Sequence, residues 1–443
     1  MAVDMALEWY LALGGVEIAN HARLDAYLQS VGSPLTSGGA CSCPTFTADL
    51  VGDLPYTDPA SDEAPWYDPD VPESAEFAGL MVLSVDGLDD YPVRRSSTAA
   101  VAGGASIGPA RVQPGTITIT GILLGSTCCG VDYGLHWLGE ALAGCGGGSG
   151  CDGDCLTLYN CCPGQEVTAE EFNARHRRTV RRVALAQGPT VTARTGDGCA
   201  AGACQAGADI LTVEIVLTAG VPWLWTDTAP LLEVPPPADG TDTCVTWCLH
   251  SAAGEGCGGG CRLAACPDPA AGCADPLCRP PAPPTADAPG SCFCLPLAVE
   301  RDCYDLDVSG RPRWAVDAPM ITVRAGSADL RNVTLSLFER ADTDAALTCE
   351  EIADAGRCDP AATWTVRYVP AGGALTLDGQ IGRAVVECGG SCESSADVYG
   401  QNGAPPSWPA LDCDRYCLCI ESDVSNPPAA DAIISVGVSG RGF

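Results

Sequence analysis

A cysteine- and proline-rich stretch, residues 235–303, limits what this chain can fold into more than any other feature. It holds ten cysteines among prolines, glycines and alanines: Cys244, Cys248, Cys257, Cys261, Cys266, Cys273, Cys278, Cys292, Cys294 and Cys303. No apolar period of two or of 3.6 residues runs through it, so its pattern predicts neither a sheet nor a helix. Because strand-like alternation lies on both sides, we interpret the stretch as a cross-linked or metal-clamped connector between two β-rich halves.

The spacing of the cysteines favours disulfides over structural zinc. Close pairs are Cys244 and Cys248, Cys257 and Cys261, Cys292 and Cys294, Cys388 and Cys392, and Cys413 and Cys417. Zinc ribbons use C-x2-C pairs repeated at a fixed distance, and that spacing is missing from this sequence. We therefore predict that these cysteines, together with Cys266, Cys273, Cys278 and Cys303, form disulfides whose pairing the sequence leaves open, with structural zinc at the clusters as the alternative. No other cofactor is expected.

The composition favours a protein of two or three domains that does not capture nucleic acid. The chain has 443 residues, is 46% hydrophobic and carries a formal net charge of −33. Binding of phosphate groups depends on Lys and Arg. A chain as acidic as this one is therefore a poor partner for DNA or anionic lipid. An acidic wall instead suits a conduit through which DNA slides without sticking.

The start of the chain predicts synthesis in the cytosol without membrane insertion. No basic region precedes an apolar core there, and no run approaches the roughly eighteen apolar residues of a membrane span. The 28 cysteines would nevertheless suit an oxidising compartment. In the cytosol such cysteines more often bind metals, and release of the protein from the cell with later oxidation of its thiols is the third alternative, so the sequence leaves the redox state open.

Residues 1–234 show strand patterns with one or two helices. Alternation on both sides of Gly14-Gly15 predicts a β-hairpin, and a short helix follows it. Residues 77–85, 116–120 and 211–217 are further predicted strands. Trp223 and Trp225 follow the last of them and are expected to be exposed.

Residues 52–74 are acidic, rich in proline and aperiodic. This pattern is typical of a long surface loop. A calcium site built from its aspartates is the alternative, although the spacing of an EF-hand loop is missing.

A basic run follows a predicted helix start. Thr168-Ala169-Glu170-Glu171 is a capping box, and the arginines after it are Arg175, Arg177, Arg178, Arg181 and Arg182. In so acidic a chain, these residues are expected to form a solvated face or ion pairs with an acidic neighbour, for which a second copy is the natural candidate. Contact with nucleic acid is the alternative.

Residues 296–443 contain short strands at the spacing of a sandwich or jelly roll, including a hairpin at Asp378-Gly379. The sequence offers no convincing catalytic motif. Gly104-Ala105-Ser106-Ile107-Gly108 matches G-x-S-x-G, but the helix that a nucleophile elbow needs is not predicted after it. The four histidines show no metal-binding spacing, so we expect no enzyme, although a Cys–His pair stays open.

Several stretches together resemble the distal tail proteins of siphophages that infect actinobacteria. The opening LALGGVEIANHARLDAYL and the segment PGTITITGILLGSTCCGVDYGLHWLGEAL are similar to the tube-like half of that family, as are RRVALAQGPTVTAR and LTVEIVLTAGVPWLW. GALTLDGQIGRAVVE and SWPALDCDRYCLCIE resemble its galectin-like half, and CADPLCRPPAPPTA is similar to its connector.

The resemblance implies a mainly β fold in three parts. These are a tail-tube-like β-sandwich with one or two helices (1–234), a Cys/Pro-rich connector (235–295) and a galectin-like jelly-roll sandwich (296–443). Such proteins form a ring, usually of six copies, that joins the tail tube to the other tail-tip proteins and continues the DNA channel. The resemblance therefore implies a virion protein of the tail tip, made in the host cytoplasm, with itself, the tail tube protein and tail-tip proteins as partners.

Two further functions are alternatives. A carbohydrate-binding adhesion module would recognise host glycan, with Trp364, Trp408 and Tyr416 as candidates to stack on sugars and core packing as their other role. A hydrolase of the host envelope would need paired carboxylates or a zinc triad, and the sequence offers neither.

Overall fold

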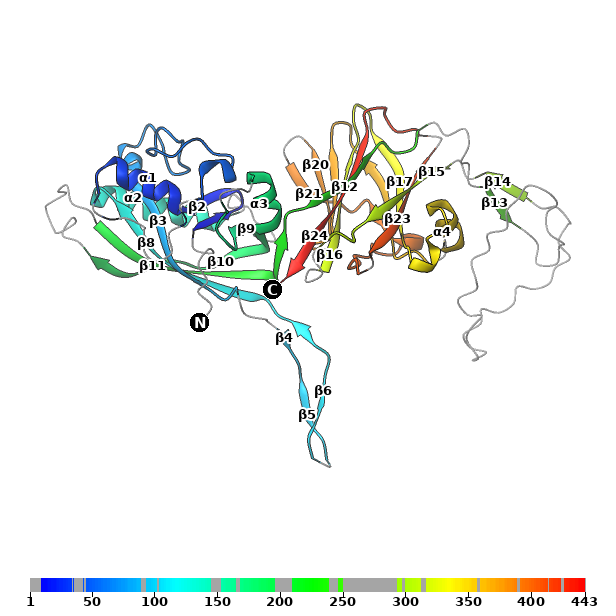
Figure 1. The fold of residues 1–443 in the computed structure, drawn as a ribbon, viewed down its shortest axis with the longest axis horizontal. Coiled ribbons are helices and arrows are strands. Elements are labelled where there is room, and N and C mark those ends of the chain that lie inside the picture. Colours follow the sequence, from blue (N-terminus) through cyan, green and yellow to red (C-terminus); the bar gives the residue numbers. More distant parts are fainter. Residues whose placement is uncertain are drawn as a thin grey trace. The chain divides into compact units, whose positions relative to one another are not determined.

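The computed structural model confirms a mainly β protein. It describes residues 9–33, 35, 43, 45–88, 93–101, 103–144, 153–164, 168–195, 209–238, 246–249, 293–296, 299–311, 316–356, 359–388, 391–412, 414–423 and 426–442. The chain divides into two compact units (Figure 1): unit 1 is Met1–Asp227 with Gly440–Phe443, and unit 2 is Thr228–Ser439.

Unit 1 is built on one antiparallel sheet in the order β2-β1-β9-β10-β11-β8-β3. The strands are β1 (Tyr10–Leu13), β2 (Val16–Asn20), β3 (Phe77–Asp86), β8 (Gly115–Gly125), β9 (Asp154–Tyr159), β10 (Arg177–Thr195) and β11 (Asp209–Thr226). The predicted hairpin is confirmed, and Gly14 and Gly15 make its turn at φ of 60° and 83°, which glycine adopts without strain. Alternate residues of β8 and β11, such as Ile117, Ile119 and Val213, are buried in one core.

Three capped helices accompany this sheet: α1 (His21–Ser30), α2 (Cys128–Ala143) and α3 (Ala169–His176). The Thr168 hydroxyl accepts the Glu171 N–H, as the capping box predicts. Asn20 and Thr127 cap α1 and α2 in the same way. Leu138 and Leu142 carry the buried stripe of α2 into the core of the sheet.

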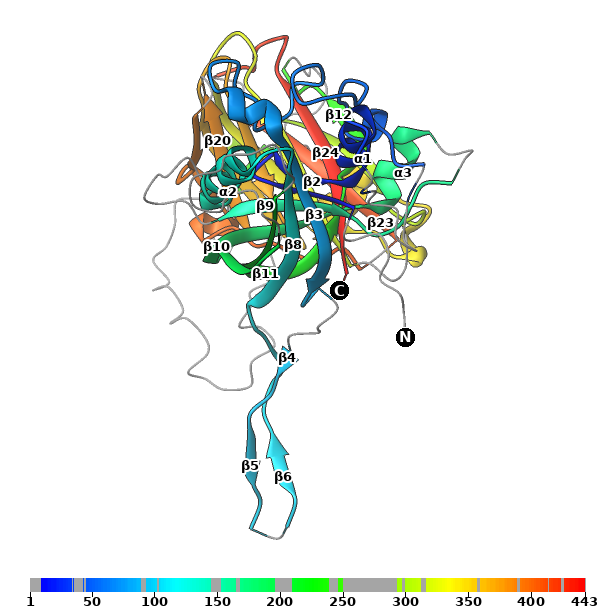
Figure 2. The ribbon, with the colours of Figure 1, turned by 90° about the vertical axis from the view of Figure 1, so that its left-hand side faces the viewer.

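A long β-arm, residues 93–114, joins β3 to β8 and is absent from the sequence predictions. It consists of β4 (Val93–Arg94) paired with β7 (Arg111–Val112), and β5 (Ser97–Ala99) paired with β6 (Ala105–Ile107). Figures 1 and 2 show the arm continuing away from the ends of β3 and β8. Both of its faces are open to solvent, so it lacks the alternation that marks a half-buried strand.

Unit 2 is a β-sandwich, as its strand spacing predicts. One sheet runs β12-β24-β16-β19-β20-β21 and the other β15-β23-β17-β18-β22. The strands are β12 (Ala229–Val234), β15 (Val299–Asp307), β16 (Val316–Arg324), β17 (Leu330–Glu339), β18 (Ala362–Val369), β19 (Ala374–Asp378), β20 (Arg383–Cys388), β21 (Ser391–Ser394), β22 (Val398–Tyr399), β23 (Arg415–Asp423) and β24 (Ile433–Gly442). Trp364 and Leu418 from one sheet share a core with Ile321 and Ile434 from the other.

In the part of the connector that the structure describes, one place departs from the prediction. β13 (Thr246–Leu249) and β14 (Phe293–Pro296) form an antiparallel pair with Cys248 opposite Cys294. Four-residue strands are too short to show an apolar period, which is why the sequence did not reveal them. The three-part division stays a prediction, and we note that β12, which precedes the boundary at 234, pairs with β24 of unit 2.

Candidate assembly interface

The β-arm is the most exposed ordered element of unit 1. Every residue of β5, β6 and β7 is exposed. Val101, Ile107 and Val112 show 108%, 69% and 43% of their surface to solvent, although apolar side chains gain stability from burial. A two-stranded ribbon of this kind is at best marginally stable alone in water. The arm therefore has the properties of an element that a partner covers.

The charge of the arm is opposite to that of the chain. Residues 93–114 contain Arg94, Arg95 and Arg111 and no acidic residue, whereas the chain carries −33. Arg94 and Arg111 face each other in register on β4 and β7. Arg95 donates one hydrogen bond to the Gly108 carbonyl at 3.3 Å, and none of the three arginines forms an ion pair with a described residue.

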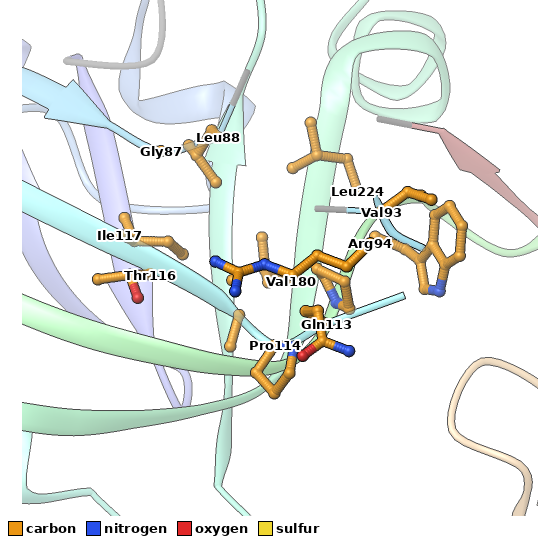
Figure 3. Close-up of a pocket in the computed structure, with 14 residues that line it drawn as sticks. Gly87, Leu88, Val93, Arg94, Gln113, Pro114, Thr116, Ile117, Val180 and Leu224 are labelled. Carbon is orange, nitrogen blue, oxygen red and sulfur yellow. The ribbon is translucent and has the colours of Figure 1, made fainter. Parts of the chain in front are cut away.

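A pocket of about 360 Å³ lies at the base of the arm (Figure 3). Leu88, Ile117, Val180 and Leu224 supply apolar walls, and the Arg94 side chain extends across it. Apolar walls with a single guanidinium suit an apolar group that ends in a carboxylate. The pocket thus has the same preference for acidic partners as the arm.

The acidic segment, residues 51–76, lies at the opposite end of β3. It holds eight carboxylates and no basic residue: Asp53, Asp58, Asp62, Glu63, Asp68, Asp70, Glu73 and Glu76. The predicted surface loop is largely irregular, and it ends in the 3-10 turn Pro72–Glu76. No group of three or more metal-ligating side chains that could hold an ion occurs among the described residues, which include this segment.

Arg23 of α1 fastens the acidic segment to the sheet. Its guanidinium lies 2.7 Å from Glu17 Oε1 and 2.9 Å from both Asp62 Oδ2 and Asp53 Oδ2. Burial raises the pKa of the Glu17 and Asp62 carboxyls, and the charge of Arg23 opposes that rise. Trp66 completes the anchor, since its indole donates to the Phe77 carbonyl at 3.1 Å and its own carbonyl accepts from Tyr133 at 2.6 Å.

The predicted basic run is spread over α3 and β10. Arg175 is exposed, Arg177 forms an ion pair with Asp227 at 2.8 Å, and Arg181 and Arg182 are half-buried. Arg178 is only 5% exposed, and burial lowers the pKa of its guanidinium. Arg178 therefore cannot meet a second copy without unit 1 opening, and inter-subunit contact through the other four stays a prediction.

A Cys–His pair does occur, at Cys161 and His176. Cys161 Sγ lies 2.8 Å from His176 Nδ1, and Asn160 Oδ1 lies 3.0 Å from the same nitrogen. A nucleophile–base–orienter relay uses the two opposite ring nitrogens instead. Burial raises the pKa of the Cys161 thiol and lowers that of His176, so both groups are neutral near pH 7, whereas a nucleophilic cysteine needs its thiolate.

Disulfides in the described residues join segments that are distant in sequence. Cys303 bonds to Cys419 across β15 and β23, and Cys417 bonds to Cys349 at the start of α4 (Cys349–Gly356). Cys43 bonds to Cys162 in unit 1. The partners Cys349 and Cys419 were not among the predicted candidates, because close sequence spacing does not identify a partner brought by the fold.

For the remaining candidate cysteines, the structure does not show whether disulfides form. Cys388 and Cys392 lie on β20 and β21, and Cys248 and Cys294 on β13 and β14, with only their backbones described. The others lie outside the described residues: Cys244, Cys257, Cys261, Cys266, Cys273, Cys278, Cys292 and Cys413. Disulfides or zinc at these positions stay predictions.

Burial corrects one aromatic expectation and assigns two other aromatic residues to core packing. Trp225 is 1% exposed rather than on the surface, because it faces the interior from β11. Trp364 and Tyr416 are 0% and 2% exposed and belong to the sandwich core, so they cannot stack on a sugar. Trp408 is half-buried, with its ring 6.3 Å from that of Trp364.

Ser106 of the G-x-S-x-G match lies on β6 of the arm, opposite Thr98 of β5, and the strands β7 and β8 follow it rather than a helix. Within the described part of the chain, no helix is long and apolar enough to cross a membrane.

Comparison with known proteins gives a likeness only at the level of solved structures. No family model and no curated protein matches the sequence. The chain is similar to the Dit protein of phage SPP1, described as a paradigm of the hub adsorption apparatus in phages that infect Gram-positive bacteria. That match has 11% identity and a TM-score of 0.31, and covers 84% of this chain and 96% of that one. A second match, to the baseplate of phage p2 in its activated conformation with Sr, has 8% identity and a TM-score of 0.33, over 77% and 90% of the two chains. These two solved structures are a phage hub protein and a phage baseplate.

Proposed function

We propose that this chain is a non-enzymatic structural subunit of a phage tail tip. Copies of it assemble into a ring that joins the tail tube to the tail-tip proteins and continues the DNA channel. The family that the sequence resembles usually forms rings of six, and its C-terminal half is galectin-like. Synthesis in the host cytoplasm and oxidation of cysteines after release belong to the same proposal.

The observation that carries the proposal is the β-arm. It is a long ribbon with exposed Val101 and Ile107 and with three arginines that pair with no described acid. An isolated subunit gains nothing from holding such an element in water, whereas an assembly buries it. The sequence-level likeness to distal tail proteins supports a ring as the form of that assembly.

The net charge of the chain supports the proposal that the ring continues the DNA channel. A ring of chains that each carry −33 repels the phosphate backbone rather than binding it. Specific capture of DNA is therefore not part of the proposed function. Glycan binding gains no support from Trp364 or Tyr416, which are buried.

Negative-stain electron microscopy of the purified full chain, with its mass measured by sedimentation, tests the proposal. We expect closed rings with a central hole and a mass of several copies. A monomer mass at every concentration, in a sample that circular dichroism shows to be folded, contradicts ring formation. A glycan array probed with the same full chain is expected to stay silent, and strong binding of one sugar class would favour the adhesion module.

A further inference from the structure

We infer that the β-arm of one copy docks on the acidic segment, residues 51–76, of a neighbouring copy. The inference rests on the proposed function, because it names the two surfaces through which the copies meet. The partner is thus a second copy of this chain, recognised through arginine–carboxylate pairs and a small apolar contact.

The two surfaces lie at opposite ends of the same strands. The acidic segment leads directly into Phe77 at the start of β3, and the arm leaves beyond Asp86 at its end. A ten-residue strand spans about 33 Å, so that distance separates the two ends. The arm also extends away from the body of unit 1 (Figure 2). An arm therefore cannot reach the acidic segment of its own chain.

The charges of the two surfaces are complementary. The arm carries three arginines without an acid, and the segment carries eight acids without an arginine. Asp53 and Asp62 of the segment already form ion pairs with Arg23 of their own chain. Glu63, Asp68 and Asp70 are exposed and form no ion pair with a described residue. Guanidinium groups pair with carboxylates through two parallel hydrogen bonds, which supplies orientation as well as attraction.

The acidic segment is a preformed receptor, since Arg23 and Trp66 hold it against the sheet. A rigid binding surface lowers the entropy lost on association. Leu54, 47% exposed, offers an apolar contact beside the carboxylates for exposed valine or isoleucine of the arm. The arm then supplies the cationic half of the contact and the anchored segment supplies the anionic half.

Contact between different patches on two copies is head-to-tail. Such heterologous contacts close into a ring when the rotation between copies closes, and extend into a filament when it does not. In a closed ring, the arm of every copy docks on the acidic segment of the next copy, so no arm and no acidic segment stays uncovered. Arm-to-segment docking is therefore a form of contact that a closed ring satisfies completely.

Charge reversal in the full chain tests the inference. Sedimentation is measured for Arg94→Glu/Arg95→Glu/Arg111→Glu, for Glu63→Arg/Asp68→Arg/Asp70→Arg, and for a chain with all six changes. Each triple variant is expected to weaken assembly by roughly tenfold or more, and the six-fold variant to restore it because both charges are exchanged. Wild-type assembly is expected to weaken as NaCl rises, since salt screens exposed charges.

A matched control makes the test specific. Arg324→Glu/Arg331→Glu/Arg367→Glu changes the net charge by the same amount on exposed positions of unit 2 and is expected to assemble as wild type. Unchanged rings in the arm triple variant, or no recovery in the folded six-fold variant, overturn the inference while the proposed ring stands. A wild-type chain that never assembles instead refutes the proposed function. DNA binding by the wild-type arm in place of self-association also overturns the inference.

Discussion

The arm and the acidic segment are both polar, rich in turns and without a core of their own. They differ in how they are attached to the rest of unit 1. The acidic segment is fastened by the buried Arg23 cluster and by Trp66, which is 5% exposed. The arm has no comparable anchor among the described residues, and its apolar side chains face solvent. The acidic segment thus has its stabilising contacts within a single chain, whereas the proposed assembly supplies those of the arm.

The largest effect is expected from breaking the anchor of the acidic segment. Arg23→Met leaves Glu17 and Asp62 buried without their counter-charge, so the free energy of unfolding of unit 1 should fall by about 3–5 kcal/mol. Chemical denaturation measures this fall, and hydrogen exchange over residues 51–76 should rise. Arg175→Met, at an exposed site, is the matched control and should change stability by less than about 0.5 kcal/mol. Equal effects of the two changes would show that the cluster is no anchor.

A covalent anchor offers a second contrast, because α4 of unit 2 is held by a disulfide as well as by the ion pair of Asp354 with Arg301. Cys349→Ala/Cys417→Ala removes this link between residues 68 positions apart and should lower the stability of unit 2 by about 2–4 kcal/mol. Ring formation should persist, since neither the arm nor the acidic segment is touched. Loss of rings with unit 2 still folded would place part of the interface near α4.

The third prediction concerns pH and the helix that carries Arg23. His21 accepts the Val82 N–H at 3.0 Å, and burial lowers its pKa from 6.5 to about 4. Between these values the unfolded chain binds a proton that the folded chain does not, so stability falls as pH falls. From pH 6.5 to 5 the loss should be about 1–2 kcal/mol, because the unfolded histidine is half protonated at the start of this range.

His21→Gln isolates that contribution. Glutamine keeps an acceptor for Val82 but does not titrate, so the variant should lose less stability than wild type over the same pH range. The raised pKa values of Glu17 and Asp62 act in the opposite sense in both proteins. Identical pH profiles for the two proteins would rule out His21 as the titrating group.

The smallest effect on stability is expected in the arm. Val101→Ser and Ile107→Ser alter side chains that contact solvent, so the free energy of unfolding should stay within about 0.5 kcal/mol of wild type. Assembly should nevertheless weaken, because the same side chains are buried by the partner. Loss of stability in the monomer would mean that the arm packs on its own chain.

Sequence reasoning succeeded where one face of an element is buried. The hairpin at Gly14, the strand at Thr116–Thr120 and the strands around Trp364 all show the alternation that a half-buried sheet imposes. Capping chemistry likewise located α3 through Thr168.

The arm and the Arg23 cluster could not be predicted from the sequence, for a physical reason. Strands exposed on both faces need no apolar alternation, so the arm looks like a loop. The partners of Arg23 lie six, thirty and thirty-nine residues away, and only the fold brings them together. The same applies to Cys349 and Cys417, whose separation of 68 residues no local spacing predicts.

Shortening the arm removes the element through which the copies are proposed to meet. Arg94 and Arg111 are opposite each other in register, so an Asn-Gly turn can replace residues 95–110 and close the hairpin at that pair. Sedimentation of this full-length variant should give a folded monomer where the wild-type chain gives rings. Rings of unchanged mass from the shortened chain would contradict assembly through the arm.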